Sequence, residues 1–435
     1  MDLLSRFDFL NPEVMRNPYP YFAEMREKAP LHYDAKMQAH VLTRYEDVSY
    51  VLKNPALFSS AQVRMAGKLQ TERSQDTGLE GVDSLLTTDP PVHTRLRGRV
   101  SRAFTPKQIS ALEPRVRELS RELVAEMTAS NEFEFMSGPA SPLPVTIIAE
   151  MLGVDISRRR DFKRWSDAIA NSGNASLTGK TPEDVVRNAK EMLAYMTEVA
   201  EARRREPRGD LISLLVQDSE GQEALTPPEV NSFAILLLLA GNETTTNLLG
   251  NALTALIRHP EAYEWLRRDP TQAACAAVAE ETLRYDSPVI TVVRRTTQEV
   301  ELSGGKVPAN TTLFGVVSAA NRDPRKFANP DRFDPRRDTT GLMSFGHGIH
   351  FCLGAPLARL EAPVALQELM ARAPAWASRR ASPSTSTTAP RSPCAAPARS
   401  GSRRTERVPL EPGSTGTKKG GRAPPRPLAS WLAPP

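Results

Sequence analysis

One cysteine constrains this chain of 435 residues more than any other feature. Cys352 stands in the run Phe-Gly-His-Gly-Ile-His-Phe-Cys-Leu-Gly, residues 345–354, directly before a helix-forming stretch at 356–370. A thiolate just before a helix is stabilised by the helix dipole and by unpaired backbone N–H groups. The sequence therefore predicts a cysteine sulfur held at the start of a helix.

The residues around this cysteine favour a flat ligand. Gly346, Gly348 and Gly354 carry no Cβ, so the backbone beside the sulfur can approach such a ligand closely. A heme iron held by one cysteine thiolate needs this arrangement. The alternative is a small free cysteine buried in a turn. The other two cysteines do not compete, because Cys275 lies in an Ala-rich helical stretch and Cys394 has no candidate ligand nearby.

The pattern Phe-Gly-x-Gly-x-His-x-Cys-Leu-Gly resembles the heme loop of the cytochrome P450 monooxygenases. The resemblance implies that Cys352 is the axial ligand of heme b, iron protoporphyrin IX. It also implies that Phe345, Gly346, His350 and Gly354 contact the cofactor.

The longest predicted helix begins with a capping box, Thr226 as N-cap and Glu229 at the third helical position. Helical character continues to about His259, roughly 32 residues or about 48 Å at 1.5 Å per residue. Residues 233–240 are apolar on every side, so we expect this part of the helix to be buried all round.

The middle of that helix carries the run Ala-Gly-Asn-Glu-Thr-Thr, residues 240–245. Ala240 and Gly241 are small and leave space beside a flat cofactor, and Thr244 can bond its hydroxyl to the carbonyl of residue 240. The run resembles the oxygen-activation motif of the family, which implies that Glu243 and Thr244 deliver protons. A solvated helix face is the alternative.

Glu281 and Arg284 match the Glu-x-x-Arg motif of the family. Residues three apart share one helix face, so the two side chains can pair. The resemblance implies a third member, Arg332 in Asn-Pro-Asp-Arg-Phe, and a buried network that orders the loop before the cysteine. Many exposed helices carry the same pair as a weak surface contact.

Heme carries two propionates, which need cations. The resemblance implies that His93 and Arg97, four residues apart, hold them together with His350 and Arg295; Arg294 is the neighbouring candidate. Each could instead be an ordinary surface cation.

By resemblance, the substrate pocket is lined by the loop at 63–86 and by Ala234, Leu238, Val289, Ile290 and Val292. Any apolar core would contain the same residue types.

The fold expected from this resemblance is mainly α with a small β region, with heme between the long helix and the helix after Cys352. Helical periodicity dominates four stretches, and β-like runs punctuate them. The helical stretches are 107–128, 182–205, 227–258 and 270–285, and the β-like runs are 40–43, 291–294, 299–302 and 312–317.

Residues 1–372 are predicted to form a single domain, and 373–435 a Pro/Ser/Arg-rich tail that is disordered by composition. The tail holds eleven Lys or Arg and two Glu, and it alone makes a chain of net charge +5 basic. A nucleic-acid role therefore has no support in the folded part.

The short terminal strands of the family are not recognisable, and Pro363 falls inside the helix after the cysteine. A reading-frame shift or a natural extension would explain the tail.

The function implied by the resemblance is insertion of one atom of dioxygen into an apolar small molecule, such as a polyketide or macrolide. No flavin or nicotinamide fingerprint is present. Electrons from NAD(P)H would then come through a ferredoxin and its reductase. We expect no membrane anchor, because the longest apolar stretch is about half a bilayer span. Three widely spaced cysteines fit a reducing cytoplasm, and we expect a monomer there. A peroxide-driven peroxygenase and a heme protein without turnover are the alternatives.

Overall fold

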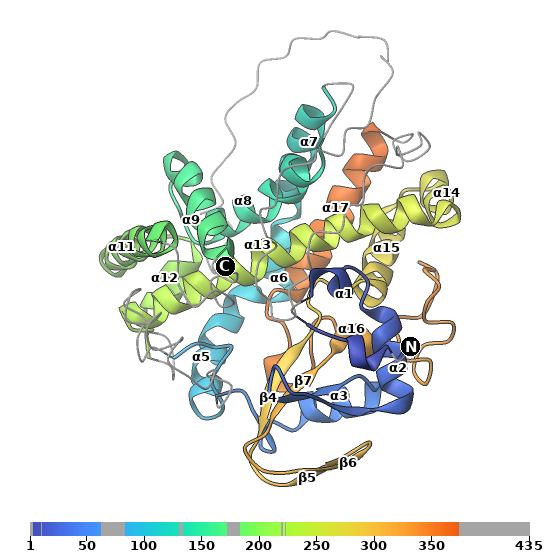
Figure 1. Cartoon of the computed structure of the whole chain (residues 1–435). Coiled ribbons are helices and arrows are strands. Elements are labelled where there is room, and N and C mark those ends of the chain that lie inside the picture. Colours follow the sequence, from blue (N-terminus) through green and yellow to red (C-terminus); the bar gives the residue numbers. More distant parts are fainter. Residues whose placement is uncertain are drawn as a thin grey trace.

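The computed structural model describes residues 3–373 except 10, 62–82, 130–133, 172–182, 219–220 and 222. Helices make up most of it, and a small β region lies at one side (Figure 1). The helices are η1 (Leu4–Arg6), α1 (Pro12–Arg16), α2 (Tyr19–Lys28), α3 (Tyr45–Lys53), α5 (Val92–Ser101), η3 (Arg102–Phe104), α6 (Pro106–Ala111), α7 (Glu113–Met127), η4 (Met136–Ala140), α8 (Pro142–Met151), η5 (Ile156–Arg158), α9 (Arg159–Asn171), α11 (Glu183–Arg205), α12 (Leu211–Val216), α13 (Pro227–Arg258), α14 (Pro260–Arg268), α15 (Gln272–Tyr285), α16 (Val317–Ala320), η7 (Gly348–His350) and α17 (Ala355–Arg372). The expected fold class is confirmed.

The β region consists of a five-stranded sheet in the order β1-β2-β7-β4-β3 and a separate β5-β6 hairpin. Strand β2 runs parallel to β7, and the other pairs are antiparallel. The predicted β-like runs correspond to β2, β4, β5 and β7. The strands are β1 (Leu31–Asp34), β2 (Ala39–Leu42), β3 (Phe58–Ser59), β4 (Val292–Thr296), β5 (Val300–Leu302), β6 (Gly305–Val307) and β7 (Thr312–Gly315).

The long helix α13 crosses the whole helical part (Figure 1). Its capping box forms as predicted: the Thr226 backbone N–H donates to the Glu229 carboxylate at 2.9 Å. The expectation of burial on every side is wrong. Ala240 is exposed, and Ile235 and Leu236 are only partly buried. One face of the helix is therefore accessible near its middle.

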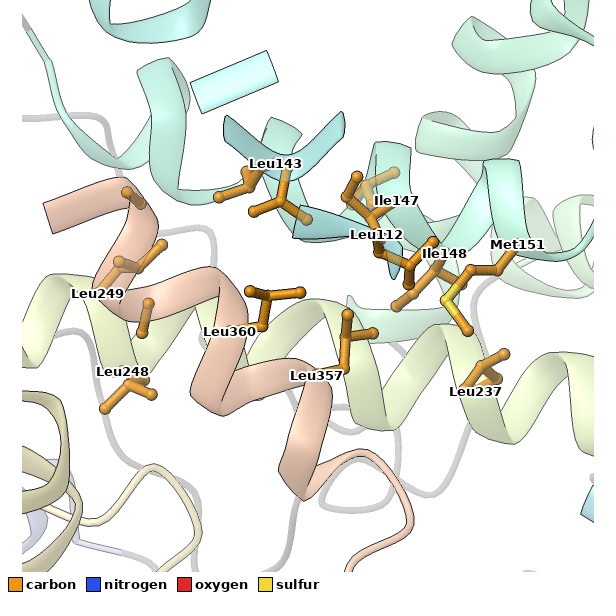
Figure 2. Close-up of a cluster of buried hydrophobic side chains, with 14 of the residues drawn as sticks. Leu112, Leu143, Ile147, Ile148, Met151, Leu237, Leu248, Leu249, Leu357 and Leu360 are labelled. Carbon is orange, nitrogen blue, oxygen red and sulfur yellow. The ribbon is translucent and has the colours of Figure 1, made fainter. Parts of the chain in front are cut away.

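Several helices of the described part of the chain pack against α13, namely η4, α8, α9, α11, α12, α14, α15 and α17. Figure 2 shows apolar side chains of α8, α13 and α17 meeting in one cluster. Burying a leucine or isoleucine contributes about 1.5–3 kcal/mol, so this cluster fixes α17 relative to α13. Gly241 serves the same contact, because a Cβ at this position would overlap the Ile148 side chain of α8.

Helix α17 continues through Pro363 to Arg372. The predicted tail, including Cys394, and the question of the terminal strands lie outside the described residues. Among the residues that the structure describes, no helix has the length and apolar character needed to cross a membrane.

Candidate functional site

The Cys352 loop folds back on itself just before α17. The Cys352 N–H donates to the Phe345 carbonyl at 2.8 Å, and Gly346 closes a turn on the carbonyl of Met343 at 2.8 Å. Gly346 has a φ of 70°, a conformation that side chains with a Cβ rarely adopt. Gly354 is the N-cap of α17. The cysteine therefore stands at the helix start, as the sequence predicts.

The charges and amides around the sulfur favour a thiolate. Burial raises the pKa of the Cys352 thiol, and several groups oppose this increase. The backbone N–H groups of Gly354 and Ala355 bond toward the sulfur, and the guanidinium groups of Arg97 and Arg359 attract its charge. These groups stabilise the thiolate, which is the form of cysteine that binds a metal, against the effect of burial.

Gly348, the second glycine of the loop, has a different role from the one expected. A Cβ on Gly348 would overlap the backbone carbonyl of Leu52, at the end of α3. Gly348 therefore lets the loop pack against protein backbone, and its φ of 70° requires glycine in any case.

Two histidines and one arginine form a cluster beside the loop. His93 of α5 and His350 lie with ring centroids 4.3 Å apart, and the Nε2 atoms of both are buried without a hydrogen-bond partner. Arg294 of β4 is buried and its charge acts on both rings. Buried polar atoms normally have partners, so this cluster is suited to an anionic ligand.

The pKa values in this cluster agree with that interpretation. Burial lowers the pKa of His350 to about 3, helped by the charge of Arg294. Burial also lowers the pKa of Arg294 to about 10. An anion bound here would oppose both shifts, because an opposite charge favours the protonated forms.

The propionate candidate Arg295 requires correction. Its side chain donates to the Asn310 carbonyl at 3.0 Å, whereas Arg294 faces the histidines. Successive residues of a strand point to opposite faces of the sheet, so only one of these neighbours can reach the cluster. Arg97 lies where expected on α5, and it donates to the Phe351 carbonyl at 2.7 Å.

The accessible face of α13 carries the acid–alcohol run. The Thr244 hydroxyl donates to the Ala240 carbonyl at 2.5 Å, as the sequence predicts. Glu243 is partly buried. Asn242 is buried and bonds to Ser166 of α9 at 2.5 Å, which holds this turn of α13 against its neighbour.

Comparison with known proteins identifies the family. The family model "Cytochrome P450" matches residues 175–372. Cytochrome P450 109 of Bacillus spizizenii is 40% identical over 81% of this chain and 84% of its own length. 6-Deoxyerythronolide B hydroxylase of Saccharopolyspora erythraea is 38% identical over 82% of this chain and 89% of its own. The structure of cytochrome P450 CYP109Q5 from Chondromyces apiculatus superposes with a TM-score of 0.75 and is 42% identical, over 84% of this chain and 90% of its own.

The chain belongs to the cytochrome P450 family. It is a P450 monooxygenase, and the family uses heme and dioxygen. The residues present fit heme: a thiolate site lies at the start of α17, and a cationic cluster with two unpartnered imidazole nitrogens lies beside it.

The Glu281–Arg284 pair of this P450 is fully buried. Arg284 Nε donates to Glu281 at 2.8 Å. The third arginine is Arg337, whose Nε donates to Glu281 at 3.1 Å. The prediction of Arg332 is wrong, because its side chain is exposed and only its carbonyl takes part, accepting from Arg284 at 3.2 Å.

The structure does not bring the expected substrate residues together. Ala234 and Leu238 are buried in the helical core around α13. Ile290 is buried in a different hydrophobic cluster, and Val292 packs against a third. The prediction for Ile290 is therefore corrected, because it is a core residue. Val289 is partly buried. Residues 63–82 of the expected substrate loop lie outside the described residues.

Sequence analysis missed one acid. Glu361 of α17 is buried, one of its carboxyl oxygens has no partner, and Thr245 of α13 bonds to the group. Burial raises the pKa of Glu361 to about 8. A single acid in the otherwise apolar run at 360–366 is a signal that could have revealed it.

Proposed function

We propose that this P450 oxidises an apolar small molecule, with Cys352 as the ligand of heme iron. The observation that carries the proposal is a cysteine sulfur at the start of α17 that accepts the N–H groups of Gly354 and Ala355. These bonds and the helix dipole stabilise the thiolate form that a metal requires.

The cationic cluster would hold the propionates. His93, His350 and Arg294 combine unpartnered donors with positive charge, and Arg97 lies on the same side of the loop. Phe345, Gly346 and Gly354 would border the cofactor because they surround the sulfur. When bound, heme b supplies the activation of dioxygen through its thiolate-ligated iron.

Glu243 and Thr244 would move the protons that oxygen activation consumes. Both lie on α13 beside the exposed Ala240, and the Thr244 hydroxyl is held in place by the Ala240 carbonyl. An alcohol fixed in this way can pass a proton from an acid to an acceptor on the accessible face of the helix.

A secondary metabolite such as a polyketide or macrolide is the proposed substrate. The relative named 6-deoxyerythronolide B hydroxylase supports this class. Electrons would come from NAD(P)H through a cytoplasmic ferredoxin and its reductase. The heme domain in this proposal is residues 1–372, and a chain ending at Ala373 is expected to bind heme as the full chain does.

Replacement of Cys352 by serine tests the ligand. The wild-type protein, reduced under carbon monoxide, should show a thiolate-type Soret band, and Cys352→Ser should lose it. Cys275→Ser is the matched control, because Cys275 is a buried core thiol whose pKa burial raises to about 12. An unchanged band in Cys352→Ser would refute the proposal.

Replacement of Thr244 by alanine tests the proton route. We expect NADPH consumption to continue while product formation falls at least about tenfold, with the missing electrons recovered as hydrogen peroxide. Thr254→Ala is the control, because Thr254 makes the same back-bond, to the Gly250 carbonyl at 2.9 Å, further along α13. Equal coupling in both variants would contradict the assignment.

A ligand panel tests the substrate class. Macrolactones, terpenoids and fatty acids are titrated into the ferric protein while the Soret band is followed. Macrolactones should displace it to shorter wavelength at the lowest concentration and be oxidised by the complete electron-transfer system. A preference for another class would replace the macrolide proposal.

A further inference from the structure

Arg359 of α17 forms a bidentate ion pair with a carboxylate of a neighbouring helix. Its Nε and Nη2 atoms donate to the two carboxyl oxygens of Glu280 of α15, at 2.6 and 3.0 Å. Bidentate pairs of this kind fix the direction of the guanidinium plane. The side chain of Glu280 is 25% exposed and that of Arg359 is 42% exposed, so the pair lies at the edge of the protein.

The same guanidinium lies against the cysteine loop. Its central carbon is 4.6 Å from the centroid of the Phe345 ring, and the Phe345 carbonyl accepts the Cys352 N–H. The charge of Arg359 is close enough to lower the pKa of the Cys352 thiol. Conversely, the pKa of Arg359 is raised mainly by its hydrogen bonds to Glu280 and to a smaller extent by the charge of Cys352.

The two cations near the sulfur differ in one respect. Arg97 donates to a neutral carbonyl, that of Phe351, whereas Arg359 is paired with a carboxylate. The carboxylate has two effects on Arg359: it fixes its position and it offsets part of its charge. The field of a charged group acts on a neighbouring site beyond direct contact, so Glu280 influences the sulfur without touching it.

We propose that Glu280 is a positioning residue that holds Arg359 against the Cys352 loop and offsets its charge, and thereby sets the reduction potential of the heme. The inference rests on the proposed role of Cys352 as iron ligand. Reduction adds an electron at the iron, so a positive charge nearby favours the reduced form and a negative charge opposes it.

Charge-neutral replacements give opposite predictions for the two partners. Glu280→Gln removes the negative charge and leaves Arg359 stacked on Phe345, so the potential should rise. Arg359→Gln removes the positive charge, so the potential should fall. The double variant should return toward wild type. Each single change should alter the equilibrium constant for one-electron reduction at least about threefold, or about 28 mV at 59 mV per tenfold change.

The measurement is spectroelectrochemical titration of the heme-loaded protein. Glu27→Gln is the matched control, since Glu27 forms another bidentate pair, with Arg325 at 2.9 Å for both bonds. Arg359→Lys retains the charge but not the bidentate bond, and its potential should lie between wild type and Arg359→Gln. It also provides a second variant if Glu280→Gln does not fold.

The outcomes separate this inference from the function. A wild-type protein with a thiolate-type carbon monoxide band, together with equal shifts in Glu280→Gln and Glu27→Gln, would overturn the inference alone. A lowered potential in Glu280→Gln would also overturn it. A wild-type protein without that band would overturn the proposed iron ligand and this inference with it.

Discussion

Two buried carboxylates of this P450, one on α15 and one on α17, differ in the groups that bond to them. Glu281 of α15 is 0% exposed and Glu361 of α17 is 1% exposed. Glu281 accepts bonds from Arg284, from Arg337 and from a backbone N–H. Glu361 receives one bond from Thr245 and keeps an oxygen without a partner. The two acids therefore differ in partners and not in burial.

The difference follows from the energy of a buried charge. A carboxylate removed from water is stable only when cations and N–H groups replace the lost hydration. Glu281 has these groups around it. Glu361 lacks them, so burial holds it neutral to about pH 8. The first acid ties distant segments together, and the second makes stability depend on pH.

The largest effect is expected from breaking the paired acid. Glu281→Gln leaves the guanidinium of Arg284, itself 0% exposed, without its charged partner. We expect a loss of about 3–5 kcal/mol in the free energy of unfolding, measured by urea denaturation. Glu264→Gln is the control, because Glu264 and Arg267 have the same spacing on the exposed face of α14 and should contribute under about 1 kcal/mol. Equal losses would contradict the comparison.

Glu361, which has no cation partner among the described residues, should lower stability when it becomes charged. The folded pKa of Glu361, about 8, lies above the ordinary glutamate value of 4.5, so the folded state holds the extra proton and stability falls as pH rises between these values. Glu361→Gln removes this dependence. The free energy of unfolding of the variant, relative to wild type, should increase by about 3 kcal/mol from pH 5 to pH 7.5. A constant difference across this range would show that Glu361 is charged in the folded protein.

Replacing Arg337 and Arg332 in turn tests which of them is the third partner of the Glu281–Arg284 pair. Arg337→Ala removes a donor to Glu281 and bonds to the Ala328 and Asn329 carbonyls, and should cost about 2 kcal/mol. Arg332→Ala should change stability by less than about 0.5 kcal/mol, because that side chain is exposed. Urea denaturation of both variants measures the difference, and a reversed order would restore the prediction made from sequence.

Thr245→Val should have a smaller effect than Glu281→Gln, Glu361→Gln or Arg337→Ala. Thr245→Val removes the hydroxyl that bonds to Glu361 and should cost about 1 kcal/mol. The hydroxyl lowers the pKa of Glu361, so its loss should move the pH-dependent transition to higher pH. Stability measured as a function of pH tests both effects, and a transition displaced to lower pH would contradict the assigned bond.

Local features of the fold were predictable because they depend on residues a few positions apart. The capping box at Thr226 and Glu229 formed as expected, and so did the bond from Thr244 to the Ala240 carbonyl. The pairing of Glu281 with Arg284 also followed from their spacing on one helix. In each case the helix itself brings the two groups together.

Contacts between segments were not predictable in the same way. The choice of Arg337 over Arg332 depends on how the loop after α16 folds over α15. The choice of Arg294 over Arg295 depends on which face of β4 meets α5. In both cases the sequence assigned the role to an arginine close to the one that fills it in the structure. A sequence pattern specifies residue types but not the direction of a side chain.

The sequence by itself determined the family, the position of Cys352 before a helix and the acid–alcohol run on the long helix, because each is encoded by neighbouring residues. Only the tertiary structure decided which acids are buried and which cations reach them. Burial and the distance between segments control both properties, and neither is a property of a local sequence pattern.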